Sequence, residues 1–390
     1  MPLKFFLLFL LFPFFSAGQS YKKIHKKAIV IDTHNDVISQ VVLEKKLNID
    51  NDLTGKAHSD LARFKKGGVD VEVFSIFCDE HFGKDTAFKY ANIQMDSLQS
   101  IINRNKDKIT LVRTLDELAK AVKQKKIGAM MGVEGGHMIE DNLTYLDSLF
   151  NRGARYLTLT WNNSTSWATS AMDESSDTLK RKKGLTDFGR QVVQRMNALG
   201  MLVDVSHVGE QTFWDVLATT TKPVIASHSC VYTISPLFRN LKDDQIKAIA
   251  KNGGVIHLNF YSAFVDSNYT KRLRNFINTQ PQTDSLLNLK WTRADILKWM
   301  LEKKSKKMDA LRPPLSLLLD HLEYIIKIAG IDHVGLGSDF DGITSSPTGL
   351  DDVADFPNIT KELVARGFSR KDIDKILGGN FIRVFKANNN

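Results

Sequence analysis

Histidines and carboxylates recur in short polar runs that directly follow apolar, strand-like runs of the sequence. These polar runs span residues 32–36, 134–137, 206–207, 227–229 and 338–341. In the first run, His34 and Asp36 are two residues apart, so on an extended segment both side chains point to the same side and can hold one cation. Glu134 can bridge two cations through its two oxygens, and His207 and His228 can complete the second site. Nitrogen and carboxylate ligands favour zinc, with manganese, cobalt or iron as alternatives.

None of these residues indicates a metal when taken alone. A His-x-Asp pair is more often part of a loop or a helix cap, and a carboxylate before two glycines, such as Glu134 before Gly135-Gly136, is also explained as part of a turn. His207 and His228 are each more readily explained as hydrogen-bonded core histidines. The combination is informative because all five predicted ligands follow strand-like runs, where barrel enzymes place their active sites.

The segments that must position these side chains are short, apolar and strand-like. Eight such runs occur, at residues 28–31, 71–77, 127–133, 154–160, 201–205, 223–226, 254–259 and 333–337. Continuous apolar runs are typical of strands that are buried on both faces, as in parallel sheets, and helical patterns separate most of them. This alternation predicts an α/β fold with a (β/α)8 TIM-type barrel, with a doubly wound open sheet as the alternative.

One segment, 269–314, falls between the seventh and eighth predicted strands and does not belong to the repeat. It is polar, rich in lysine and helical in pattern. We expect a helical insertion over the mouth of the barrel and not a second domain. Residues 19–390 would then form one metal-dependent barrel.

The N-terminal residues 1–18 have the features of a secretory signal peptide. A lysine precedes an apolar run, and the small residues Ser16-Ala17-Gly18 come directly before Gln19. The apolar run is shorter than the roughly 20 residues that span a bilayer, which argues against a membrane anchor. We therefore expect cleavage near residues 18–19 and a secreted or periplasmic protein without a membrane span.

Composition and charge exclude several other classes of protein. The chain has 390 residues, of which 43% are hydrophobic and 25% are charged, as is usual for a globular protein with a large core. The net charge of +9 comes from short, dispersed basic runs. Nucleic-acid binding would require one basic stripe with aromatic platforms, so we do not expect it. Cys78 and Cys230 are interpreted as packed thiols.

Eight motifs together resemble one known family, the membrane (renal) dipeptidases or M19 peptidases, within the amidohydrolase-type barrels. The motifs are IDTHND, GVEGGH, RYLTLT, VDVSH, PVIASHS, FRN, GSDFDG and GNFIRVF. They extend from Ile31 to Phe385 and cover nearly the whole chain after the predicted signal peptide. The resemblance gives no information on segment 269–314, for which we find no counterpart in the mammalian members.

This resemblance implies a dipeptidase with two zinc ions in each chain. One ion would be held by His34, Asp36 and Glu134. The other would be held by Glu134, His207 and His228, so that Glu134 is the catalytic bridge. A hydroxide shared by the two ions would attack the peptide carbonyl of a small dipeptide. Related enzymes also suggest a homodimer.

The resemblance further assigns residues to substrate binding and proton transfer. Arg239, in the FRN motif, would bind the C-terminal carboxylate of the dipeptide, and Asp339 would act as the acid and base. Tyr261 would line the substrate pocket. The mammalian-type enzymes carry a histidine straight after the LTLT strand, where this chain has Trp161. That change leaves the predicted metal ligands intact but removes an imidazole donor from the reacting centre.

Three other functions account for parts of the sequence. The same scaffold could hydrolyse a lactone, a β-lactam or an N-acyl amino acid, because fold alone does not determine the reaction. A non-catalytic binding protein that keeps the barrel is favoured only by Trp161. A structural or surface-interaction protein is suggested only by the basic charge and leaves the strand-end histidines unexplained.

Overall fold

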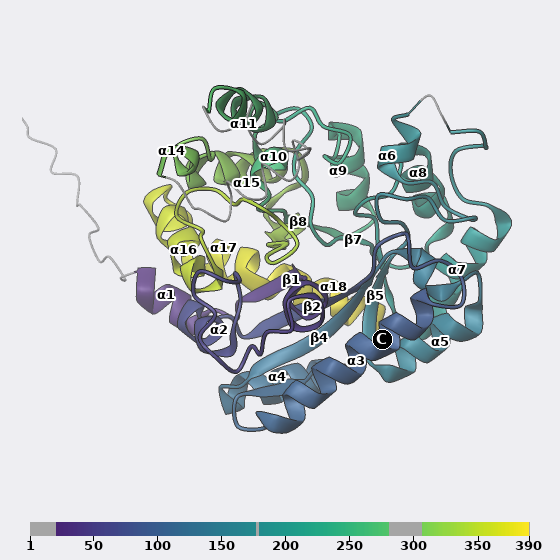
Figure 1. Cartoon of the computed structure of the whole chain (residues 1–390), viewed down its shortest axis with the longest axis horizontal. Helices are drawn as coiled ribbons and strands as arrows, with labels where there is room; N and C mark the ends of the chain where they lie inside the picture. Colours follow the sequence, from purple (N-terminus) through teal and green to yellow (C-terminus); the bar gives the residue numbers. More distant parts are fainter. Residues whose placement is uncertain (1–20, 177–178, 281–305, 390) are drawn as a thin grey trace, which may run out of the picture.

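The computed structural model describes residues 21–176, 179–280 and 306–389, and its centre is a nearly closed parallel barrel (Figure 1). Its eight strands follow one another in chain order: β1 (Ile31–Asn35), β2 (Val71–Phe77), β4 (Ile127–Glu134), β5 (Ala154–Thr158), β6 (Leu202–Asp204), β7 (Ile225–Ala226), β8 (Val255–Leu258) and β9 (Val334–Leu336). The barrel closes where Asn35 bridges Phe340 and the amide of Asp36 donates to the Phe340 carbonyl at 2.9 Å. The predicted TIM-type barrel is therefore confirmed, and the doubly wound alternative was wrong.

The strand boundaries differ from the prediction mainly at β1. The sequence indicated residues 28–31, whereas β1 spans Ile31–Asn35, so His34 lies within the strand and not after it. A continuous apolar run was the criterion, and the polar end of β1 does not meet it, although all its residues are buried. A short strand that was not predicted, β3 (Ile109–Leu111), pairs with β4 outside the barrel order.

Helices flank the strands of the barrel (Figure 1). They are α1 (Tyr21–Lys27), η1 (Val37–Glu44), α2 (Leu61–Gly67), α3 (Ala87–Arg104), α4 (Leu115–Gln124), η2 (Gly136–Ile139), α5 (Leu143–Arg152), α6 (Ala171–Glu174), α7 (Asp187–Leu199), α8 (Glu210–Thr219), α9 (Asp243–Lys251), α10 (Ser262–Val265), α11 (Tyr269–Asn278), α14 (Lys306–Asp309), α15 (Leu315–Ala329), η3 (Ile331–His333), η4 (Val353–Asp355), α16 (Phe356–Ala365), α17 (Arg370–Asp374), η5 (Lys375–Gly379) and α18 (Asn380–Asn388). Their ends follow local chemistry. At α7, the Thr186 side chain accepts from the Gly189 amide, and Gly200 ends the helix with φ 76°.

Two apolar layers hold these elements together. The larger layer lies between strands and helices and contains Phe74 and Ile76 of β2. Val71 and Val73 of the same strand belong to an inner cluster that includes Phe381 of α18. Such alternation is expected because successive side chains of a strand point to opposite faces. The inner cluster fills the floor of the barrel, so the polar strand ends lie at the opposite mouth.

The segment predicted as an insertion is described only in part. It contains α11 and α14, and Tyr269 and Met308 from these helices pack in a small apolar cluster of their own. Residues 281–305 of this segment and residues 1–18 of the predicted signal peptide lie outside the described residues. The insertion, the one-domain organisation and the export of the protein stay predictions. Over the described ranges, none of the helices has both the length and the apolar character that a membrane crossing requires.

Candidate metal centre and active site

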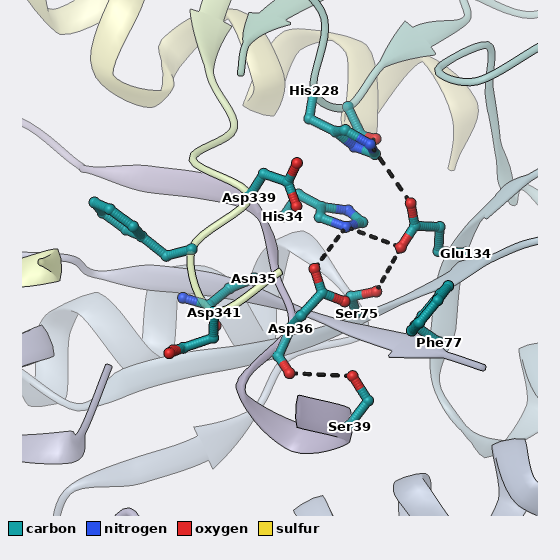
Figure 2. A network of polar contacts seen from close by, with 12 residues as sticks. His34, Asn35, Asp36, Ser39, Ser75, Phe77, Glu134, His228, Asp339 and Asp341 are labelled. Atoms are coloured by element: carbon teal, nitrogen blue, oxygen red, sulfur yellow. Dashed lines mark hydrogen bonds and ion pairs between the residues drawn. The ribbon is translucent and has the colours of Figure 1, made fainter. Parts of the chain in front are cut away.

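The five predicted metal ligands lie together at the mouth of the barrel and are all buried. Figure 2 shows His34, Asp36, Glu134 and His228 of this cluster. His34 Nε2 is 3.5 Å from Asp36 Oδ2 and 3.2 Å from Glu134 Oε2. On the other side, Glu134 Oε1 is 3.0 Å from His207 Nε2 and 3.5 Å from His228 Nε2. The two oxygens of Glu134 therefore face different imidazoles, which is the arrangement of a bridging carboxylate.

Charge and burial set the protonation of this cluster. Burial alone would raise the pKa of the Glu134 carboxyl, but His34 and His207 outweigh it and hold the pKa well below its usual range. Burial lowers the pKa of His207 to about 4, so its ring is neutral near pH 7. Burial alone would lower the pKa of His34, but Tyr156, Glu134 and Asp36 together outweigh burial and hold the pKa well above its usual value. A bound cation would satisfy the same carboxylates and displace that proton.

Hydrogen bonds behind the cluster orient His34 and His228. The Tyr156 hydroxyl donates to the Thr33 carbonyl at 3.1 Å, so it accepts from His34 Nδ1 at 2.7 Å. In the same way, Ser227 Oγ donates to Asp204 Oδ2 at 2.6 Å and accepts from His228 Nδ1 at 2.8 Å. Both rings thus carry a proton on Nδ1 and direct Nε2 into the cluster.

Such hydrogen bonds behind a ligand are typical of metal-binding histidines. The sequence reasoning did not assign this role to Tyr156, Ser227 or Asp204. Tyr156 and Asp204 lie far along the chain from the residues they support, and Ser227, although adjacent to His228, is oriented by its bond to the distant Asp204. One feature of the sequence could have indicated such a contact, because Asp204 is a carboxylate inside the apolar run 201–205.

Unsatisfied polar atoms show that these residues fit a metal ion. Asp36 Oδ1 is buried and has no hydrogen-bond partner among the described residues. His34 Nε2 likewise makes no hydrogen bond of good geometry there, although two carboxylate oxygens lie within 3.5 Å of it. Buried polar groups without partners are costly, and a metal ion would supply the missing interaction.

The ligand atoms fall into two overlapping groups. His34, Glu134 and His228 form one group, and His34, Asp36 and Asp339 form the other, with the atoms of each group within 4.8 Å of one another. The predicted grouping had not included Asp339. His207 lies next to the first group, with its Nε2 2.9 Å from His228 Nε2. Its backbone is in the left-handed region with φ 64°, a conformation that is rare outside functional or turn positions.

Asp339 has the surroundings of a proton-transfer group. Burial raises the pKa of its carboxyl well above the usual value, although the charge of His34 acts in the opposite direction. Asn259 Nδ2 donates to Asp339 Oδ2 at 2.8 Å and fixes one oxygen. The other oxygen is left for a proton from the reacting groups, which suits general acid–base chemistry.

Three of the four predicted substrate residues line the cavity above the cluster. Trp161, Tyr261 and Asp339 border it together with His207 and Glu134, and its volume is about 340 Å³. Trp161 packs edge-on against Phe77, with ring centroids 4.9 Å apart. The wall of the cavity at this position therefore carries the indole of Trp161 and not an imidazole.

Arg239, the fourth predicted substrate residue, borders a second cavity of about 290 Å³, which shares His207 with the first. It is buried, and its guanidinium lies 5.2 Å from the ring of Phe264. Arg239 Nη2 approaches the His228 carbonyl at 3.4 Å. Within the part of the chain that the structure describes, Arg239 forms no ion pair and its Nε has no partner. This side chain is thus a buried cation without a charged neighbour in contact.

Three other buried histidines and the two cysteines lie outside the site. His25, His257 and His321 are buried, and a ring nitrogen of each contacts a backbone carbonyl at 2.8–3.0 Å. Cys78 and Cys230 are buried and unpaired, as predicted, and burial raises the pKa of each thiol to about 12. Both thiols are therefore protonated and unreactive near neutral pH.

A parallel barrel that gathers imidazoles and carboxylates at its C-terminal strand ends has the architecture of a metal-dependent hydrolase. Comparison with known proteins narrows this class. The model of the membrane dipeptidase family, peptidase family M19, matches residues 19–390. An uncharacterised dipeptidase of Schizosaccharomyces pombe is 32% identical over 388 residues, covering 95% of this chain and 83% of that protein. The chain belongs to the membrane dipeptidase family.

Solved structures share the fold. The probable dipeptidase PvdM from Pseudomonas aeruginosa is 24% identical with a TM-score of 0.75, covering 94% of this chain and 97% of that one. A metallopeptidase from Rhodobacter sphaeroides, solved with a phosphinate mimic of the dipeptide L-Ala-D-Ala, is 23% identical with a TM-score of 0.74. That similarity covers 93% of this chain and 99% of the Rhodobacter chain. Family membership supports metal-dependent hydrolysis of dipeptides by this chain.

Proposed function

We propose that the protein is a zinc-dependent dipeptidase with two metal ions in each chain. His34, Asp36 and Glu134 would hold one ion, and Glu134, His207 and His228 would hold the other. The observation that carries this proposal is the position of Glu134, whose Oε2 faces His34 while its Oε1 faces His207 and His228. Imidazole and carboxylate ligands are those that zinc prefers in hydrolases.

The two ions would lower the pKa of a shared water molecule and polarise the peptide carbonyl. The protein's own residues perform the proton transfer. Asp339 is a half-buried carboxyl on the same side of the mouth as His34 and Asp36, and it lines the cavity above the cluster. It would receive the proton of the attacking water and deliver it to the leaving amine.

The size and charge of the site support a short, carboxylate-bearing substrate. The cavity above the cluster and the cavity beside it both border His207, and Arg239 lines the second. A dipeptide that places its peptide bond above Glu134 would extend its C-terminal carboxylate towards Arg239. The Rhodobacter relative binds a phosphinate mimic of the dipeptide L-Ala-D-Ala, which supports a dipeptide as the substrate. A longer peptide has no carboxylate at that place.

Arg239→Ala tests whether the substrate is a free dipeptide or an amide in general. A guanidinium and a carboxylate form two parallel charged hydrogen bonds, and hydrogen bonds to charged groups contribute roughly 1.5–3 kcal/mol. We expect kcat/KM for a dipeptide to fall by about ten- to a hundred-fold or more. The corresponding dipeptide amide should already be a poor substrate and should be affected little. Steady-state kinetics with both substrates measure the difference.

Two variants serve as controls for this comparison. Arg239→Lys should recover only part of the loss, because an ammonium cannot reproduce the two parallel bonds. Arg195→Ala removes an exposed arginine that pairs with Asp147 on the outside of the barrel. This variant should leave kcat/KM unchanged for both substrates. Equal losses for dipeptide and amide in Arg239→Ala would contradict the carboxylate contact and favour the wider set of amidohydrolase reactions.

A further inference from the structure

The loop that carries Asp339 has an unusual backbone. Asp339 and Asp341 both lie in the left-handed region, with φ 61° and 67°. Residues with a Cβ atom are strained there, so surrounding contacts must maintain the conformation. Figure 2 shows that Asp339 points toward His34, whereas Asp341 points away from the cluster. The two aspartates of this loop therefore have different tasks.

Asp341 is held by a reciprocal pair of hydrogen bonds with His58. The His58 amide donates to Asp341 Oδ1 at 2.7 Å, and the Asp341 amide donates to His58 Nδ1 at 3.0 Å. Because Nδ1 accepts a hydrogen bond, it carries no proton, and the 3.6 Å separation between Nδ1 and Asp341 Oδ1 is not an ion pair. The ring of His58 also stacks on Phe340 at 5.1 Å.

The segment around His58 is itself anchored on both sides. Arg63 Nη1 donates to the Ala57 carbonyl at 3.0 Å and to Asp352 Oδ2 at 2.9 Å. The amide of Val353 donates to the His58 carbonyl at 3.1 Å. His58 is therefore a fixed point against which the loop can be held.

The other side of the same loop is bonded to the metal-ligand strand. The amide of Asp339 donates to the His34 carbonyl at 3.0 Å, and the amide of Asp36 donates to the Phe340 carbonyl at 2.9 Å. Asn35 Nδ2 also donates to Ser59 Oγ at 2.8 Å, next to His58. The loop is thus clamped between β1 and the segment at His58.

We propose that His58 and Asp341 are positioning residues that hold Asp339 in the geometry needed for proton transfer. The inference rests on the proposed acid–base function of Asp339. Neither residue borders the cavity above the cluster, and His58 lines a separate cavity of about 240 Å³ next to α11. Both residues would act through the backbone of the loop and not through contact with the substrate.

The test is a comparison of His58→Leu, His58→Asn and the control His333→Leu. Leucine removes the acceptor at Nδ1, whereas the amide oxygen of asparagine can replace it. His333 Nδ1 contacts the Gly254 carbonyl at 2.8 Å at the opposite end of β9, so His333→Leu removes a comparable bond away from the site. We expect His58→Leu to lower kcat about 10- to 100-fold, since small misplacements of catalytic groups have effects of this size.

Further measurements separate positioning from general stability. In His58→Leu, KM and metal content should stay unchanged, and the amides of Asp339 and Asp341 should exchange hydrogen faster. His58→Asn should regain most of the kcat, and His333→Leu should keep it. If His58→Leu does not fold, Asp341→Gly replaces it, because glycine tolerates the positive φ while lacking the carboxylate that accepts from His58.

A kcat within about twofold of the original enzyme in folded His58→Leu would overturn the proposal. So would equal losses in His58→Leu and His333→Leu, or a lower melting temperature with an unchanged kcat. A fully active Asp339→Asn enzyme would instead overturn the acid–base function of Asp339. The two failures are therefore distinguishable.

Discussion

Glu134→Gln is expected to release both metal ions together and to abolish dipeptide hydrolysis. Glutamine keeps the size of the side chain but leaves only one oxygen, and its amide nitrogen cannot bind a cation. Since Glu134 Oε2 faces His34 and Oε1 faces His207, neither rotamer of the amide can serve both sides. Removing a residue that only hydrogen-bonds to a metal ligand typically lowers metal affinity 10- to 100-fold. Glu134 is itself a proposed ligand of both ions, so we expect Glu134→Gln to lower metal affinity by more than about 100-fold.

Elemental analysis and competition with a chelator measure this loss. Glu140→Gln is a suitable control, because Glu140 lies shortly after β4 and accepts from the amides of Asp85 and Phe88 at 2.9 Å each. That variant should keep its metal. If Glu134→Gln retained one ion with unchanged affinity, Glu134 would be a ligand of a single ion and not the bridge.

Asp339→Asn is expected to keep its metal but to lower kcat by about 10²- to 10⁴-fold, the usual contribution of a general acid–base group. Asparagine tolerates the left-handed backbone of residue 339, where φ is 61°, so the loop should remain in place. Its amide oxygen can still accept the hydrogen bond from Asn259 that Asp339 Oδ2 accepts at 2.8 Å. Only the ability to take up a proton is lost.

Steady-state kinetics and metal analysis on the same preparation test this expectation. KM should change far less than kcat, because Asp339 is assigned to the chemical step and not to anchoring the substrate. A near-native kcat with full metal content would remove Asp339 from the mechanism. A loss of metal would show that Asp339 acts as a ligand, as its proximity to His34 and Asp36 allows.

The barrel and the clustering of the five predicted metal ligands could be predicted because both depend on local pattern. Buried parallel strands are continuous apolar runs, and the carboxyl ends of such strands meet at one mouth, which brings His207 and His228 close to Glu134. β1 was misplaced because Asp32–Asn35 are polar yet buried by closure of the barrel. These polar residues contact residues near position 340 where the barrel closes, and the pattern of one short sequence segment does not reveal such contacts.

Contacts between distant segments were beyond such reasoning. Tyr156 orients His34 across 122 residues of sequence, and His58 meets Asp341 across 283. Nothing in the composition of either segment indicates its partner. Arg239 was assigned to the substrate through family resemblance alone, and the structure adds that it is buried beside His207, in a cavity adjoining the one above the metal ligands.

The central claim is most directly tested by following metal content and dipeptide turnover in one sample. The protein is first treated with a chelator and then titrated with zinc, while elemental analysis and hydrolysis of a free dipeptide are measured at each step. We predict that turnover is absent from the metal-free protein and reaches its maximum at about two zinc ions per chain, as in other two-metal hydrolases. Full turnover in protein shown to contain no transition metal would contradict the account.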